Sequence, residues 1–219
     1  MAETPSTMLD LGTPAPDFRL PDTEGRIVSR ADFRDAKALL VMFICNHCPF
    51  VKHVRHELAR VGKEYQARDI AIVGISSNDA VAYPADGPDA MREEKEQIGY
   101  TSPYLYDETQ EVAKAYGAAC TPDFFLYGPE GRLAYRGQLD DSRPSGEKPV
   151  TGKDLRAALD AVLEDRPVDP EQRPSLSLQH QVEAGQRARL LRLACISGRG
   201  PRSRTATPEP PRGVAGARP

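Results

Sequence analysis

Two closely spaced cysteines, followed at once by a proline, are the residues of this chain best suited to chemistry. They lie in the run Cys45-Asn46-His47-Cys48-Pro49, directly after the apolar stretch Ala38 to Ile44. This order predicts a buried strand that delivers two thiols to the start of a helix. A helix N-terminus stabilises a thiolate, which is the reactive form of cysteine. The spacing therefore favours thiol–disulfide exchange.

The expected helix start fixes where the two thiols stand. A helix that begins near Pro49 places Cys48 at its N-terminal edge, and a proline is tolerated there because its missing N–H costs no helix hydrogen bond. Cys45 then lies at the end of the strand. A disulfide between the two is sterically plausible, although the spacing alone does not establish it.

The rest of the sequence predicts the elements that must position these thiols. Apolar residues at spacings of three and four give the helix from about Pro49 to Arg68 one apolar face. A second buried strand is expected at Ile70 to Ser76, with a loop at 78–89. Further helices are expected at 88–99, 107–117 and 151–163, and hairpins at 18–28 and 124–136. Strands that alternate with crossover helices predict an α/β fold with a central mixed sheet flanked by helices.

Charge and composition exclude several classes of function. The 219 residues carry a net charge of -3, but the part from Glu171 onward has nine Arg, no Lys and three Glu, so residues 1–170 carry -9. This acidic part does not suggest nucleic-acid binding. We see no apolar run of membrane-spanning length and no secretory signal in Met1 to Asp10. We therefore expect a cytoplasmic protein with no nucleic-acid or membrane partner, in which a close cysteine pair is catalytic or metal-binding.

Three separated motifs resemble one known group. They are Gly12 to Asp22, Cys45 to Lys52 (CNHCPFVK) and Thr121 to Leu126 (TPDFFL). Together, over about residues 9–178, they are similar to the redoxin branch of the thioredoxin superfamily, which includes the peroxiredoxins of the alkyl hydroperoxide reductase and thiol-specific antioxidant type. The resemblance implies a thioredoxin-like fold with an N-terminal β-hairpin extension.

The resemblance leaves two assignments for the attacking thiol. Thioredoxins use the first cysteine of Cys-x-x-Cys, which is Cys45 here. Alignment by the strand before the motif instead gives Cys48 the nucleophile position, and peroxiredoxins also place their attacking cysteine before a proline. Our hypothesis is that Cys48 attacks and Cys45 resolves, with the reverse order as the alternative. His47, between the thiols, could tune thiolate stability.

The second expected site element is Thr121-Pro122, where the superfamily keeps a cis-proline. By resemblance, this loop faces the thiols and leaves the Thr121 backbone free to pair with an extended substrate chain. Cys120 precedes it and is either an additional thiol near the site or a buried small apolar residue.

The functional hypothesis is a thiol–disulfide oxidoreductase without metal or organic cofactor. It would reduce a protein or small-molecule disulfide and take electrons from a partner dithiol. The first alternative is a peroxiredoxin-like peroxidase with antioxidant activity. Peroxiredoxins carry a hydroxyl residue three positions before the attacking cysteine and a proline four further upstream, where this chain has Cys45 and Val41. The second alternative is a redox-sensing module that does not turn over.

Metal binding is a rival use of these residues. His47, His53 and His56 lie close by, and zinc accepts Cys and His. However, the chain has no second Cys-x-x-Cys, and His53 and His56 are expected to face solvent. We therefore predict no metal site.

The C-terminal part, 169–219, reads as an Arg- and Pro-rich disordered tail after a redoxin domain of residues 1–168. Relatives in this branch continue from Pro-Ser/Ala-Leu/Ile into Gly-Cys-Asn-Ile-Lys-Trp-Lys-Pro-Gly. Residues Leu178 to Gly185 can be encoded so that the frame shifted by one base reads Cys-Asn-Ile-Lys-Trp-Lys-Pro. We therefore predict that the tail is a frameshift product and that Cys195 has no role.

Overall fold

A computed structural model describes residues 3–179 of the chain. Its main feature is a five-stranded sheet in the order β6-β5-β4-β8-β9. The strands are β4 (Ala38–Phe43), β5 (Ile70–Ser76), β6 (Tyr104–Tyr106), β8 (Asp123–Tyr127) and β9 (Leu133–Gly137). β4 runs parallel to β5, and β5 runs parallel to β6. β8 runs antiparallel to both of its neighbours, β4 and β9. The predicted mixed sheet is confirmed.

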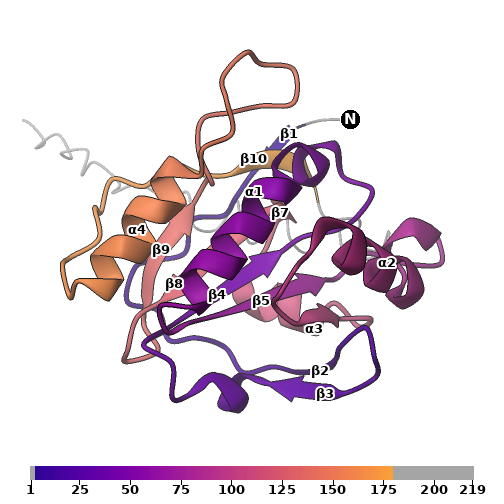
Figure 1. The fold of residues 1–219 in the computed structure, drawn as a ribbon, viewed down its shortest axis with the longest axis horizontal. Helices are drawn as coiled ribbons and strands as arrows, with labels where there is room; N and C mark the ends of the chain where they lie inside the picture. Colours follow the sequence, from indigo (N-terminus) through magenta and orange to yellow (C-terminus); the bar gives the residue numbers. More distant parts are fainter. Residues whose placement is uncertain (1–2, 180–219) are drawn as a thin grey trace, which may run out of the picture. The chain divides into compact units, whose positions relative to one another are not determined.

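Within residues 3–179, four α-helices flank this sheet: α1 (Pro49–Gln66), α2 (Pro88–Ile98), α3 (Glu111–Tyr116) and α4 (Lys153–Leu163). Figure 1 shows α1 and α4 side by side across one face of the sheet. The smaller elements are the hairpin β2 (Arg19–Pro21) and β3 (Ile27–Ser29) and the 3₁₀ helices η1 (Arg30–Phe33) and η2 (Pro84–Asp86). The N-terminal hairpin was predicted from its turn residues.

Strand β4 builds the two halves of the core because successive side chains point to opposite faces. Leu40 and Met42 pack with the apolar faces of α1 and α4. Val41 and Phe43 pack on the other face with α3 and the β2 strand. All six residues of β4 are buried. The continuous apolar sequence before Cys45 is thereby explained, since this strand is covered on both sides.

A second, three-stranded sheet was not predicted. It contains β1 (Glu3–Pro5), β10 (Leu176–Gln179) and β7 (Cys120–Thr121), with β10 in the middle. Leu178 lies opposite Thr121, and Gln179 opposite Cys120. The ordered chain thus extends past the expected boundary at residue 168, because residues 169–179 bond to the body of the fold, for example through the Gln172 amide to the Ala134 carbonyl. The predicted disorder of 180–219 concerns residues outside the described range.

Candidate active site

The structure places Cys48 as the residue that caps α1, which begins at Pro49 as predicted. The Cys48 side chain makes no capping hydrogen bond, and the first turn of α1 contains no acidic residue. The positive end of the helix dipole therefore has no carboxylate of its own first turn to neutralise it. A thiolate on Cys48 would take that place.

Thr121 contacts both sulfurs of the pair. The Cys48 Sγ donates to the Thr121 carbonyl over 3.1 Å, and the Cys45 Sγ lies 3.3 Å from the Thr121 hydroxyl oxygen. A cis peptide bond joins Thr121 to Pro122, as expected. Strand β4 and the start of α1 thus bring both cysteines to the loop that the sequence singled out, although the two segments are more than 70 residues apart.

Both thiols are covered. Cys45 and Cys48 are each 1% exposed, and Cys120 is 0% exposed. The prediction that the Thr121 backbone is free for a substrate chain is wrong for this structure, because β10 already pairs with Thr121. A substrate disulfide can reach Cys48 only after the segments that cover it have moved.

The environment of Cys45 disfavours its thiolate. Interaction with the Cys48 sulfur, burial and the negative charge of Asp86 together raise the pKa of Cys45 well above the ordinary value. The Thr121 hydroxyl acts in the opposite direction. These surroundings favour the protonated form of Cys45, a state that suits a resolving cysteine.

Cys120 lies beside the site as a third thiol. Its Sγ is 3.8 Å from the Pro122 carbonyl oxygen, and burial, followed by the charge of Asp123, raises its pKa well above the usual range. These surroundings fit the interpretation of Cys120 as a small apolar residue, since a thiol that keeps its proton is a poor nucleophile.

The main residue that the sequence analysis missed is Asp86, at the end of η2. Its carboxylate is fully buried and accepts hydrogen bonds from the backbone N–H of Asn46 (2.8 Å) and of His47 (3.1 Å). The predicted loop at 78–89 is rich in Pro, Gly and Asp, so it signalled a turn. No local pattern distinguished Asp86 from Asp79 or Asp89, because only the folded chain brings residue 86 to the cysteines.

His47, His53 and His56 differ in their burial and in their hydrogen-bond partners. His47, half-buried, directs its Nδ1 at Asp86 Oδ2 over 2.5 Å, and its ring stacks on Tyr83. His56 is exposed as predicted, but the prediction for His53 is wrong. The His53 Nε2 lies 3.1 Å from the Ser142 hydroxyl, because the 138–143 loop folds over the first turns of α1.

One set of possible metal ligands does occur among the described residues. Donor atoms of Cys45, His47 and Asp86 lie within 4.8 Å of one another. The Asp86 oxygens, however, already accept four N–H donors, from the two backbone amides, His47 and Asn78. This arrangement satisfies the carboxylate through hydrogen bonds, and it is not organised around an ion.

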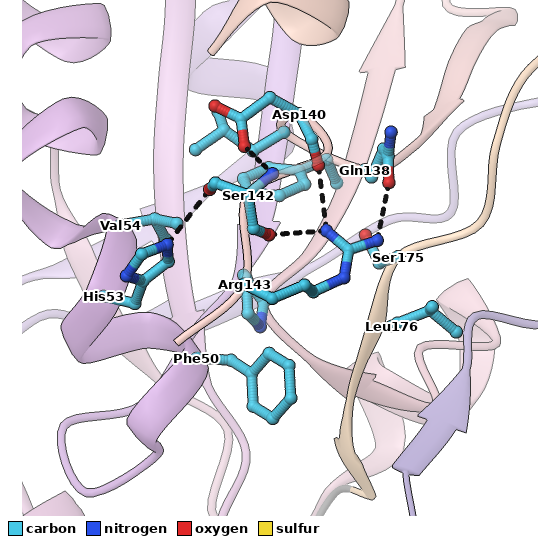
Figure 2. Close-up of a pocket in the computed structure, with 12 residues that line it drawn as sticks. Phe50, His53, Val54, Gln138, Asp140, Ser142, Arg143, Ser175 and Leu176 are labelled. Atoms are coloured by element: carbon cyan, nitrogen blue, oxygen red, sulfur yellow. Dashed lines mark hydrogen bonds between the residues drawn. The ribbon is translucent and has the colours of Figure 1, made fainter. Parts of the chain in front are cut away.

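A small pocket of about 30 Å³ adjoins the site. Pro122 and Phe124 line it together with Phe50 and His53 of α1. Figure 2 shows Arg143 among the lining residues, with its guanidinium donating to the carbonyls of Asp140 and Ser142 and to the Gln138 side chain. A pocket of this size holds a water or a small group rather than a whole ligand. It therefore adds a recess beside the cis-proline.

Residues 11–136 match the protein-family model described as the AhpC/TSA family. The chain belongs to the AhpC/TSA family. The match covers both cysteines and Thr121-Pro122, so the resemblance to the redoxin branch of the thioredoxin superfamily is confirmed. Within residues 3–179, no helix has the length and apolar character needed to cross a bilayer.

The curated relatives include proteins named as peroxiredoxins and proteins named as thiol-disulfide oxidoreductases. A Mycobacterium tuberculosis protein named as a peroxiredoxin is 29% identical over 115 residues, which are 52% of this chain and 68% of that protein. The thiol-disulfide oxidoreductase ResA of Geobacillus thermodenitrificans is 29% identical over 135 residues, 59% of this chain and 70% of ResA. Redox chemistry of the thioredoxin-like type is common to both.

Solved structures confirm the fold. A hypothetical protein from Sinorhizobium meliloti 1021 is 50% identical, with a TM-score of 0.82, over 83% of this chain and all of its own. The thioredoxin domain of a Bacteroides vulgatus thiol-disulfide oxidoreductase is 21% identical, with a TM-score of 0.50, over 59% of this chain and 89% of the domain. The predicted thioredoxin-like fold is therefore correct.

Proposed function

We propose that this AhpC/TSA-family oxidoreductase reduces disulfides with Cys48 as the nucleophile and Cys45 as the resolving thiol. The observation that carries the proposal is the position of Cys48, at the N-terminus of α1 and beside the Thr121-Pro122 loop. Cys45, next to it, is the thiol whose surroundings hold the proton.

The reaction would proceed in two exchanges. The Cys48 thiolate attacks one sulfur of the substrate disulfide, a new S–S bond forms, and the other substrate sulfur leaves with the electron pair and takes a proton from water. Cys45 then loses its proton and attacks the Cys48 sulfur. The Cys45–Cys48 disulfide forms, the second substrate thiol is released, and two electrons have passed to the substrate.

The substrate would be a protein or small-molecule disulfide, and a partner dithiol would return the Cys45–Cys48 disulfide to the reduced state. The reaction needs no metal or organic cofactor, because the electrons reside on sulfur throughout. A reducing compartment such as the cytoplasm suits this direction, since the dithiol is the form that attacks.

Two single substitutions test the assignment of roles. Cys48→Ser should abolish the reduction of insulin or another model disulfide, and Cys45→Ser should accumulate a mixed disulfide on Cys48, detected by mass spectrometry after acid quenching. Cys195→Ser is the matched control and should behave like the unaltered chain. If Cys45→Ser abolishes reduction while Cys48→Ser traps the mixed disulfide, the roles are reversed.

Peroxide reduction is the second candidate, favoured by the family and by the mycobacterial relative named as a peroxiredoxin. Cys45 stands three residues before Cys48, at the position where peroxiredoxins carry a hydroxyl residue. The Thr121 hydroxyl lies beside Cys45. We therefore propose weak peroxidase activity beside efficient disulfide reduction. Peroxide consumption with a thiol donor, measured beside insulin reduction, distinguishes the two, and a chain inert in both assays would favour a redox sensor.

A further inference from the structure

Asp86 holds the segment between the two cysteines from outside their own loop. Its Oδ1 accepts the backbone N–H groups of Asn46 and His47, the two residues that separate Cys45 from Cys48. The carboxylate is 0% exposed. A buried carboxylate is costly unless several donors satisfy it, so this contact fixes the backbone between the thiols.

The side chains of the same two residues are also held by the segment around η2. His47 Nδ1 contacts Asp86 Oδ2, which Asn78 Nδ2 reaches over 2.9 Å. The Asn46 amide donates to the Ala85 carbonyl over 2.9 Å and accepts from the Tyr104 hydroxyl over 3.1 Å. The loop that carries the thiols is therefore bound at both of its inner residues.

The charge of Asp86 also lies close to Cys45. One of its carboxylate oxygens lies within 4.8 Å of the Cys45 Sγ. The ion-pair partner of Asp86 is His47. Within residues 3–179, no Lys or Arg forms an ion pair with Asp86. A negative charge at this distance in a buried site opposes a second one on Cys45.

The other groups that face Cys45 act in known directions. The Cys48 sulfur and burial raise the pKa of Cys45, and the Thr121 hydroxyl lowers it. Tyr104, which is itself fully buried, has a raised pKa chiefly through burial, so its phenol carries no charge near neutral pH. When Cys48 enters a mixed disulfide, its own influence on Cys45 is lost, whereas that of Asp86 remains.

We propose that Asp86 is a positioning residue that directs the first attack to Cys48, by holding the Asn46-His47 backbone and placing a fixed negative charge beside Cys45. This proposal rests on the proposed function and adds the residue that determines which of the two thiols attacks first. Without the carboxylate, Cys45 competes with Cys48 for the first attack.

Alkylation of single-thiol chains by neutral iodoacetamide tests this without any turnover. In the Cys48→Ser background, Asp86→Asn should speed the modification of Cys45 by about tenfold at pH 8 and lower the midpoint of its pH profile by about one unit. In the Cys45→Ser background, the same change should alter the Cys48 rate much less. Peptide mass spectrometry resolves each cysteine from Cys120 and Cys195.

A matched control removes a charge from the same loop farther from the sulfurs. Asp79→Asn should leave both profiles unchanged. Asp86→Ser, a smaller neutral replacement, repeats the test should the asparagine variant fail to fold. Loosening of the loop alone would speed both thiols equally, so an equal change, or no change at Cys45, overturns the proposal. A chain that alkylates as expected but does not reduce disulfides would instead overturn the proposed function.

Discussion

At the scale of single residues, neighbouring groups of the site have opposite effects on the thiolates of the two cysteines. The Thr121 hydroxyl favours a thiolate on Cys45, while Asp86 disfavours it. The Thr121 carbonyl accepts from Cys48, the thiol at the positive end of a helix. The carbonyl contact favours the protonated Cys48 thiol, whereas the N-terminus of α1 favours its thiolate, so the two influences on Cys48 also oppose each other.

Asp123, the residue after Pro122, makes a testable contribution to stability. Burial raises the pKa of Asp123 to about 6, although Arg136 opposes the rise. Because the folded state binds this proton more tightly than the unfolded state, the contribution is complete below pH 4 and is lost as the pH rises through 6. Relative to Asp123→Asn, the chain should lose about 2 kcal/mol of unfolding free energy between pH 4 and pH 7.

Urea unfolding of both chains at several pH values checks this expectation. Asp123→Asn keeps an oxygen for Arg136 and removes only the titrating group. A difference between the two chains that stays constant across this range, or that grows in favour of the unaltered chain, would contradict the assignment.

The residues of the site differ in how far the sequence could reveal them. Cys45, Cys48 and Pro49 are adjacent in the chain, so local order was enough, and Thr121-Pro122 was found through the resemblance. Asp86 could not be found in this way. Its role depends on a tertiary contact between two loops, and a carboxylate in a polar loop is in most proteins exposed to solvent.

At the scale of elements, long segments were predictable and short ones were not. The strand before Cys45 and the helix after Cys48 carry enough apolar residues to show their period. β6, β7 and β10 contain two to four residues each, too few for a period to appear. β10 alternates leucine with polar residues over only four positions, and the contacts that order it come from β1 and β7, at distant points of the sequence.

β10 should limit access to the thiols, because it pairs with the residue that contacts both of them. As the central strand of its sheet, it donates hydrogen bonds on both sides, so Leu178→Pro removes one donor. The loss of about 1 kcal/mol should raise the iodoacetamide rate of Cys48 roughly five- to tenfold.

The control for this change is Leu178→Ala, which keeps the N–H group and should leave the Cys48 rate near that of the unaltered chain. Hydrogen exchange at Thr121 reports whether the strands have separated. Separation without any gain in Cys48 reactivity would show that another segment covers the sulfur.

At the scale of the whole molecule, the prediction about the C-terminal reading frame concerns the same strand. The shifted frame begins at the second base of codon 178, so its cysteine would stand at position 178, opposite Thr121. The gene sequence decides the matter. Codons 178–185 should read Cys-Asn-Ile-Lys-Trp-Lys-Pro in the next frame, and any other peptide there rules the frameshift out.

The pairing of β1 with β10 also has a consequence for biosynthesis. Glu3–Pro5 leaves the ribosome first among the described residues, but its partner, Leu176–Gln179, is made only after the entire sheet and all four helices. A nascent chain therefore makes its cysteines and the Thr121-Pro122 loop before the strand that pairs with Thr121 exists. During translation the cysteines should therefore be more open to cellular oxidants and reductants than they are in the finished fold, where both are buried.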